Sequence, residues 1–311
     1  MSSRKYPWYG LIGIVGLILG EIFLARGVGT VARWFTPIMW TAYFLAIDAL
    51  VHRLGGSAWL IARRREFPLM VLVSVAVWIL FEAYNLHLKN WVYLGVPTQP
   101  ALRLLAYFWA FATIMPGVFV TSALVETLWR RTARPVARPT HLGPSWLWFL
   151  LGLAMVTVPL ALPEGVAALL FAPVWIGFIF LLDPVNESLN ADSLRRQWRA
   201  GDRATTISLL IGGLICGFLW EAWNYQALLA RGGHWVYTIP QALRLFGWHY
   251  GQMPVLGLGG FPPFALELFA FYSLSKSMLG GDRVFGSNPA ADDRVPSRTT
   301  TPLPAVQDAA E

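Results

Sequence analysis

Long apolar runs recur along most of this chain and are separated by short polar segments. An α-helix needs about 20 mostly apolar residues to cross the hydrocarbon core of a bilayer. The pattern therefore predicts an all-α fold, a polytopic transmembrane helix bundle of about eight spans. The spans are expected over residues 8–25, 34–52, 67–88, 104–128, 145–163, 166–183, 206–226 and 246–275.

Composition and charge agree with this class. The chain is 56% apolar and 13% charged, whereas soluble domains carry about 25% charged residues, so a water-soluble globule is excluded. The net charge of +7 would suit a nucleic-acid binder, but the basic residues lie in short loops beside the apolar runs. Loop Lys and Arg set membrane orientation, so no nucleic-acid partner is expected.

The basic residues also predict the orientation. With the N-terminus inside, 18 of the 24 Lys and Arg fall on the cytoplasmic side, which places both termini in the cytoplasm of a bacterial-type membrane. Arg4 and Lys5 precede the first run, as in a signal peptide, but no small-residue cleavage site follows before Arg26. We expect an uncleaved anchor.

The chain repeats itself at an offset of about 140 residues, and such self-similarity indicates a duplicated architecture. Each copy has four spans, so both copies enter the membrane in the same direction, as in parallel repeats. The expected domains are a first repeat (1–138), a second repeat (139–279) and a disordered cytoplasmic tail (280–311). The matching segments are Phe35–Pro37 with Phe171–Pro173, Phe81–Asn85 with Trp220–Asn224, Trp91–Tyr93 with Trp235–Tyr237, and Ala101–Leu104 with Ala242–Leu245.

Both copies carry an acid and an amide near the outer end of their third span. Glu82 precedes Asn85, and Glu221 precedes Asn224, at a spacing that puts each pair on one helical face. An acid at the centre of a span costs about 2.5 to 3.5 kcal/mol on insertion scales, so it normally faces the bundle interior. Glu82 and Glu221 are therefore candidate catalytic acids, and Asn85 and Asn224 candidate ligand-binding residues.

Two interpretations of the acids stay open. In the structural one, the carboxylates accept hydrogen bonds from Trp or Asn, or pair with Arg103 and Arg244 at the same outer level. In the functional one, Arg103 and Arg244 help to bind a ligand in a polar pocket near the outer leaflet. Apolar walls would there keep a carboxyl protonated as a general acid.

Aromatic pairs follow the acids in each copy. Trp91 with Tyr93, and Trp235 with Tyr237, lie between an acid-bearing span and an arginine. Such pairs are typical of the interfacial aromatic belt, and they would equally suit the mouth of a pocket. They are candidate ligand-binding residues.

The last span is interrupted by Gly257–Pro263, and a broken helix is a pointer to a binding site. Glu267 lies just beyond this break and is the third candidate catalytic acid. The inner acids Asp48 and Asp183 stand beside basic loops, where solvated or ion-paired roles are expected, so they are left out of the site.

Several other chemistries find no support in the sequence. His87, His234 and His249 fall on the outer side, but no ligand spacing typical of zinc or iron sites occurs, and no metal is expected. No nucleotide-binding, serine-hydrolase or helix-turn-helix motif occurs in the structural context that it would need. The acid chemistry considered below requires no cofactor. Cys216, the single cysteine, lies in an apolar run and is expected to be buried and inert.

The duplicated order of acid, Ala, Asn, Trp-Val-Tyr, Pro and acid resembles the small membrane-embedded carotenoid enzymes that cyclise or hydrate isoprenoid ends. The resemblance covers about 45 residues in each copy (78–126 and 217–267). It lacks the family's Pro-x-Glu-Glu motif. The resemblance implies that Glu82, Glu221 and Glu267 occupy the positions of the acids.

Three functions follow from these observations. The first is a membrane protein with an acidic and aromatic pocket for an isoprenoid or lipid, with or without acid-catalysed chemistry, in which aromatic faces would stabilise a cation. The second is a proton- or cation-coupled transporter or channel, with the broken span as a gate. The third is a non-catalytic membrane assembly protein.

Overall fold

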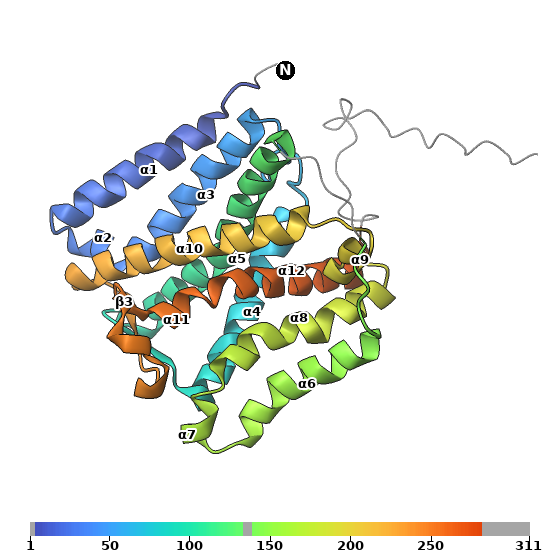
Figure 1. Cartoon of the computed structure of the whole chain (residues 1–311). Helices are drawn as coiled ribbons and strands as arrows, with labels where there is room; N and C mark the ends of the chain where they lie inside the picture. The colour runs from blue at the N-terminus through green and yellow to red at the C-terminus, as the bar shows by residue number, and fades with distance from the viewer. Residues whose placement is uncertain (1–3, 133–138, 282–311) are drawn as a thin grey trace, which may run out of the picture.

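Helices form within all eight apolar ranges of the chain. The computed structural model describes residues 4–132 and 139–281, so nearly all of the expected tail lies outside the described residues (Figure 1). The eight longer helices are α1 Trp8–Ala25, α3 Phe35–Arg53, α4 Phe67–Leu88, α5 Pro100–Thr132, α6 Ser145–Ala161, α8 Phe171–Ser188, α10 Ala204–Leu229 and α12 Phe261–Met278.

Shorter elements connect these helices. The predicted last span, 246–275, is wrong over residues 246–254, which form turns and a hairpin. The part of it that is long and apolar enough to cross a membrane is Val255–Met278. The connecting elements are α2 Gly29–Arg33, α7 Glu164–Ala167, α9 Leu194–Arg199, α11 Val255–Leu258, the 3₁₀ turns η1 Gln241–Leu243 and η2 Leu245–Gly247, and the strands β1 Trp91–Leu94, β2 His234–Tyr237, β3 His249–Tyr250 and β4 Met253–Pro254.

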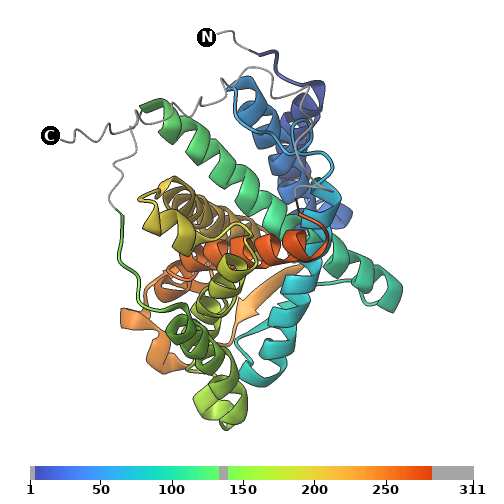
Figure 2. The ribbon, with the colours of Figure 1, turned by 90° about the vertical axis from the view of Figure 1, so that its right-hand side faces the viewer.

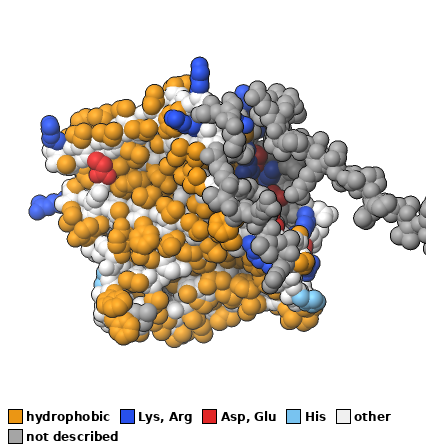
Figure 3. All heavy atoms as spheres, turned by 45° about the horizontal axis from the view of Figure 1, so that its top comes forward, with side chains coloured by type: hydrophobic (Ala, Val, Ile, Leu, Met, Phe, Trp, Pro, Cys, Tyr) orange, Lys and Arg blue, Asp and Glu red, His pale blue; other side chains and the backbone are white. Residues whose placement is uncertain are grey.

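Six segments of the described chain are long and apolar enough to cross a membrane. They are α1, α3, α4, α5, α10 and the α11–α12 segment, while α6 is an apolar helix of only 17 residues. Apolar side chains cover most of the molecular face seen in Figure 3, with basic groups toward its edges. The protein is therefore a membrane-embedded, all-α helical bundle.

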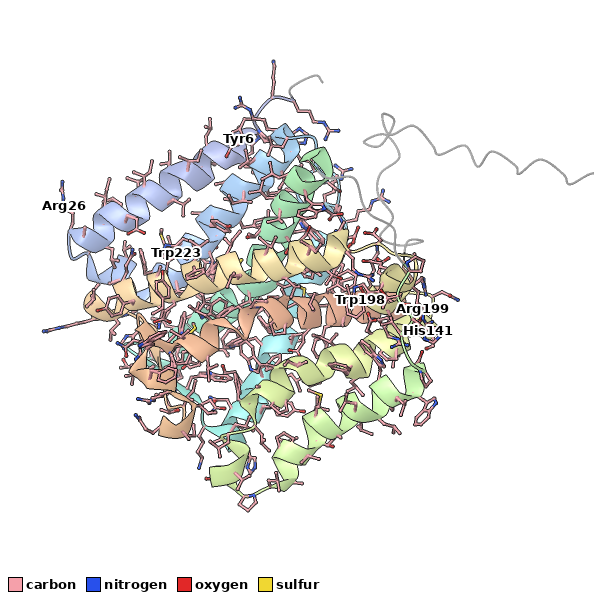
Figure 4. All side chains as sticks on the ribbon, in the orientation of Figure 1. Tyr6, Arg26, His141, Trp198, Arg199 and Trp223 are labelled. Carbon is pink, nitrogen blue, oxygen red and sulfur yellow. The ribbon has the colours of Figure 1, made fainter. Side chains whose placement is uncertain are left out.

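The helices are arranged around a central group of four. Helices α1 and α3 pack together on one side of the bundle, α6 and α8 pack together on the other, and α4, α5, α10 and α12 lie between them (Figures 1 and 2). The end that carries β1 and β2 is called the ribbon end below. Figure 4 places Arg26 at the ribbon end, and His141, Trp198 and Arg199 at the opposite end.

The two outer helix pairs use glycine for close approach. A side chain on Gly13 of α1 would meet the carbonyl oxygen of Ala42 in α3 at 2.5 Å. Likewise, a side chain on Gly152 of α6 would collide with the backbone of Leu181 in α8. Small residues let membrane helices pack backbone to backbone, which explains how weakly amphipathic helices find a fixed partner.

Asp48 and Asp183 do not have the solvated or ion-paired roles expected from sequence. Both are fully buried, and each accepts hydrogen bonds from backbone N–H groups of the following loop. Asp48 receives the N–H of Trp59 at 2.6 Å, and Asp183 receives that of Leu194 at 2.8 Å. These acids fix the loops at the end opposite the ribbon, because a buried backbone donor needs a partner.

Candidate functional site

The two Trp-Val-Tyr segments pair with each other in an antiparallel ribbon. Trp91 lies opposite Tyr237, and Tyr93 lies opposite Trp235, so β1 and β2 join the two halves of the chain. Their sequences are too short to be predicted as strands from periodicity. The pairing brings four of the candidate ligand-binding residues together.

Asn85 and Asn224 hold the strands of this ribbon to the ends of α4 and α10. The Asn85 amide donates to the carbonyl of Trp91 at 2.9 Å and accepts the Trp91 N–H at 3.2 Å. Asn224 makes the same two bonds to Trp235, at 3.0 and 2.9 Å. Because both amides are used in this way, their role in the site is to position the strands.

Glu82 lies behind Tyr93. The Tyr93 hydroxyl donates to Glu82 Oε1 at 2.6 Å, and the Trp91 indole N–H donates to the same oxygen at 3.0 Å. The Trp78 indole N–H in turn donates to the Tyr93 hydroxyl at 3.1 Å. Glu82 is thus held by two aromatic donors of the ribbon.

Glu221 lies behind Tyr237 in a similar arrangement. The Tyr237 hydroxyl donates to Glu221 Oε2 at 3.3 Å and accepts from the Trp235 indole at 2.8 Å. The second oxygen of Glu221 accepts the backbone N–H of Gln252, from the hairpin of β3 and β4, at 2.5 Å. Gly251 permits this approach, because its φ is +60° and a side chain there would meet Glu221 at 2.5 Å.

Both tyrosines keep their protons. Burial raises the pKa of the Tyr93 hydroxyl well above its usual value, and the neighbouring Glu82 raises it further. The pKa of Tyr237 is raised in the same way, first by burial and then by Glu221. Each hydroxyl is therefore a hydrogen-bond donor over the whole physiological range.

A cavity of about 360 Å³ lies beside the ribbon, between α3, α4, α5, α8, α10 and the α11–α12 segment. Its wall is mainly apolar and contains no charged side chain. A wall of this kind suits a lipophilic ligand. The aromatic lining residues are Trp40, Trp78, Trp91, Tyr93, Phe111, Phe171, Trp175, Trp220, Trp235, Tyr237 and Phe261.

The glutamates are not part of the cavity wall. Tyr93 and Tyr237 line the cavity, whereas Glu82 and Glu221 bind the hydroxyls of these tyrosines and do not line it. A direct contact between either carboxyl and a ligand, as the sequence suggested, does not fit this arrangement. The tyrosines are the acidic groups nearest to the cavity.

Glu267 is buried outside the cavity lining. Its Oε1 accepts the backbone N–H of Phe178 in α8 at 3.1 Å, while Oε2 has no hydrogen-bond partner among the described residues. An unpaired buried carboxylate is costly, so a protonated side chain fits this position. Glu267 therefore connects α12 to α8 and is not part of the site.

The two arginines also lie apart from the glutamates. Arg103 is exposed, and Arg244 donates from Nε to the carbonyl of Ile239 at 3.2 Å. Within the described residues, no ion pair joins either arginine to Glu82 or Glu221, and neither arginine lines the cavity. The expected pairing of these arginines with the glutamates, based on their similar depth in the membrane, therefore does not occur within the described residues.

The sequence prediction missed the central part of the wall. Trp40, Trp175 and Trp220 come from three different helices, and nothing in their spacing indicates that they meet. The indole nitrogens of Trp40 and Trp175 are buried and have no partner in the described chain. A ligand atom that accepted from either nitrogen would offset the cost of leaving it unpaired.

A buried ionic cluster near the opposite end was also missed, because its basic residues were interpreted as orientation signals. The Arg63 guanidinium donates to Glu66 from Nε at 3.0 Å, Tyr272 also donates to Glu66, and Lys276 lies 3.4 Å from it. Burial alone would raise the pKa of Glu66, but these partners outweigh burial and hold it below its usual value. The cluster connects the start of α4 to α12.

The described residues contain no group of three His, Cys, Asp or Glu that could hold a metal ion. Comparison with known proteins gives no match for the chain among family models, curated sequences or solved structures. Function must therefore be inferred from the site itself.

Proposed function

We propose that this protein binds a lipophilic molecule, an isoprenoid or another lipid, in the aromatic cavity beside the ribbon. The supporting observation is the cavity itself: a membrane-embedded helical bundle keeps a space lined by apolar and aromatic side chains, with two tyrosine–glutamate pairs at its edge. Packed interiors rarely leave such a volume empty, and large concave apolar sites are typical of ligand binding.

The pairs also suit acid chemistry on such a ligand. The Tyr93 hydroxyl contacts Glu82 at 2.6 Å. When Glu82 is protonated, this bond would reverse: the carboxyl would donate to the Tyr93 oxygen, and the Tyr93 proton would pass to a double bond at the cavity wall while Glu82 replaces it and becomes a carboxylate. Glu221 and Tyr237 offer the same relay. The tryptophan faces around them would stabilise a developing cation, in line with the proposed resemblance to isoprenoid-modifying enzymes.

The binding site lies between two repeats in this proposal. The parallel 4+4 duplication relates β1 to β2, α4 to α10 and α5 to the α11–α12 segment, and Trp91, Tyr93, Trp235 and Tyr237 line one shared cavity. The ribbon end faces the outside, and α6 and α8 complete the eight spans. Neither a nucleic acid nor a resident cofactor is part of this function.

Analysis of co-purified lipids tests this proposal. Ala110 of α5 lines the cavity, so Ala110→Trp should fill part of it, whereas Ala101→Trp adds the same bulk at an exposed site of the same helix. Mass spectrometry of extracts should show a lipid that co-purifies with wild type and with Ala101→Trp. In Ala110→Trp it should fall about tenfold, which corresponds to about 1.4 kcal/mol of binding free energy.

The same measurement can refute the proposal. If both tryptophan variants retain identical lipids at identical yield, the cavity is not the binding site.

A further inference from the structure

The exposed residues of the cavity wall lie on one side of the cavity. Nearly all of its lining residues are buried or half-buried, and those that are exposed cluster on two neighbouring segments. Leu169 and Ala172 lie at the start of α8, while Leu256 and Gly259 lie in α11 and at the break before α12. The cavity therefore has a side opening between the start of α8 and the α11–α12 break.

This opening is limited in extent by the packing of α8 against α12. Further toward the opposite end, the Asn186 side chain donates to the carbonyl of Ala270 at 2.9 Å, and Phe178 donates to Glu267 at 3.1 Å. These contacts hold α8 and α12 together between the break and the end opposite the ribbon. At the break itself, Gly259 and Gly260 line the cavity together with Ala172 and Trp175 of α8.

The rim of the opening is apolar. Leu169 is 39% exposed and Leu256 is 47% exposed, and their exposed neighbours Val166 and Val255 are also aliphatic. In a membrane-embedded bundle, lipid chains cover an exposed aliphatic surface, because contact between apolar side chains and water is unfavourable. The opening thus faces the hydrocarbon of the bilayer rather than the aqueous phase.

Glycines keep the opening free. A Cβ on Gly259 would meet only the carbonyl oxygen of Leu256, at 3.3 Å, and one on Gly260 would approach the Trp175 ring at 3.4 Å. The corresponding part of α5 is a continuous helix with Pro116 inside it. The break before α12 therefore leaves the rim without side chains at Gly259 and Gly260.

We propose that the cavity exchanges its ligand directly with the hydrocarbon core of the membrane, through this side opening between α8 and the α11–α12 break. The proposal rests on the proposed function and adds a substrate class to it: a neutral lipophile dissolved in the bilayer, not a water-soluble molecule. The aromatic wall receives such a ligand without any passage through water.

The entry route can be tested by blocking the side opening with a covalent label. In Gly259→Cys the new thiol lies at the rim, and the native Cys216 is fully buried. N-cyclohexylmaleimide, applied to the detergent-solubilised protein before reconstitution so that water reaches the rim thiol, should therefore modify the rim selectively. Leu104→Cys, on α5 and 70% exposed, gives a labelled control outside the cavity lining. All-trans-retinol in nanodiscs of neutral phospholipid is the probe, since it accepts excitation energy from tryptophan.

The rate of tryptophan quenching after addition of retinol measures entry. Labelling of Gly259→Cys should slow the saturable phase at least about tenfold, a change equivalent to about 1.4 kcal/mol in the barrier. Unlabelled Gly259→Cys and labelled Leu104→Cys should behave like wild type. An unchanged rate after complete labelling at residue 259 would overturn the side opening as the route of entry.

The failure of the underlying function has a different signature. Ala110→Trp, with its cavity filled, gives the baseline for retinol that stays in the bilayer. If unmodified wild type shows no saturable quenching above this baseline, the cavity does not bind lipophiles, and the proposed function falls together with the route.

Discussion

The two glutamates of the site have different surroundings although their sequence contexts match. Glu82 is half-buried and receives two aromatic donors. Glu221 is fully buried and receives one aromatic donor, the Tyr237 hydroxyl, together with the Asn224 amide and the backbone N–H of Gln252. A structural role would need only the acceptor oxygens. A catalytic role would also need the titratable proton, so the two roles can be separated by substitution.

Replacement by glutamine is therefore the informative change. Glu82→Gln and Glu221→Gln both remove the titratable proton. Glu82→Gln keeps the one oxygen that accepts from Tyr93 and Trp91, so stability should change by about 1 kcal/mol or less. In Glu221→Gln the new NH2 group must face either the Gln252 N–H or the Tyr237 hydroxyl, so we expect a loss of about 1–3 kcal/mol. The chemical identity of co-purified lipids should shift toward an unmodified precursor. Thermal unfolding, monitored by exposure of the buried Cys216, and lipid mass spectrometry give the two readouts.

Tyr93→Phe and Tyr237→Phe should reproduce the lipid change if the tyrosines relay the proton. If both glutamine variants keep the wild-type lipid profile, the proton-donor hypothesis must be replaced by the structural one.

The sequence predicted which residue types the site would use, but not how they are arranged. Burying an acid in a membrane span costs free energy, so Glu82 and Glu221 could be selected from sequence. Tyr93 and Tyr237 could be selected because the Trp-Val-Tyr segment occurs twice. Their order from the cavity outward, tyrosine first and glutamate behind, depends on contacts between segments. Local patterns carry no information about such contacts.

At the scale of elements, the antiparallel ribbon connects the halves in a symmetric way. Val92 pairs with Val236, and the pairs on either side exchange tryptophan and tyrosine between the strands. Equivalent strands pair in this manner when a two-fold axis passes through the ribbon. The ribbon thus supports the proposed parallel duplication, in which the axis runs along the membrane normal.

The register of the ribbon predicts a specific cross-link. Directly opposite residues have Cβ atoms about 4.5 to 5.5 Å apart, near the range that a disulfide bridges, whereas diagonal residues are about 7 to 8 Å apart. Val92→Cys with Val236→Cys should therefore oxidise readily, and Leu94→Cys with Val236→Cys should not. Mass spectrometry after alkylation of free thiols distinguishes the two.

Efficient bridging of the diagonal pair instead would show that the strands are shifted from this register.

The buried cluster around Glu66 makes a further element-scale contribution, by joining α4 to α12. Because the pKa of Glu66 is lower in the folded protein than its usual value of 4.5, its contribution to stability is complete at neutral pH. This contribution is lost as the pH falls below 4.5 and through the folded pKa. We expect the denaturation midpoint, followed by tryptophan fluorescence, to fall as the pH is lowered from about 6 to about 3.

Glu66→Gln should be less stable at pH 6 and should lose less stability on acidification. Glu164→Gln is the matched control, because Glu164 pairs with Lys89 on the surface, where both side chains are more than half exposed. Exposed pairs contribute little, so this variant should follow wild type. Equal pH dependence in wild type and Glu66→Gln would remove Glu66 from the explanation.

For the whole molecule, apolar run length predicted the positions of the helices well and the form of the last span poorly. In a bilayer every backbone group must be bonded internally, so long apolar runs become helices whatever their neighbours are. Gly257–Pro263 marked an interruption, but the hairpin before it and the cavity beside it arise from tertiary packing. Six segments of the described residues have the length and composition of a span, and the direction of their insertion is a prediction from charge.

Labelling of single cysteines tests that direction. Thr98 shortly follows β1 and Gln241 shortly follows β2, so these two exposed residues lie at the ribbon end. The exposed residues Arg64, just before α4, and Ala200, just after α9, lie at the opposite end. These sites avoid Gly95, where a side chain would collide with Gly232. The topology predicted from sequence puts 18 of the 24 basic residues on the cytoplasmic side and the ribbon on the other, so we expect the ribbon end outside.

A membrane-impermeant maleimide should therefore modify Thr98→Cys and Gln241→Cys in intact cells, and Arg64→Cys and Ala200→Cys only after permeabilisation. Wild type is the control for background, because Cys216 is buried in the folded protein. Modification of Arg64→Cys in intact cells would reverse the orientation. The aromatic cavity would then lie in the inner leaflet, and the ligand would enter it from the cytoplasmic leaflet of the membrane.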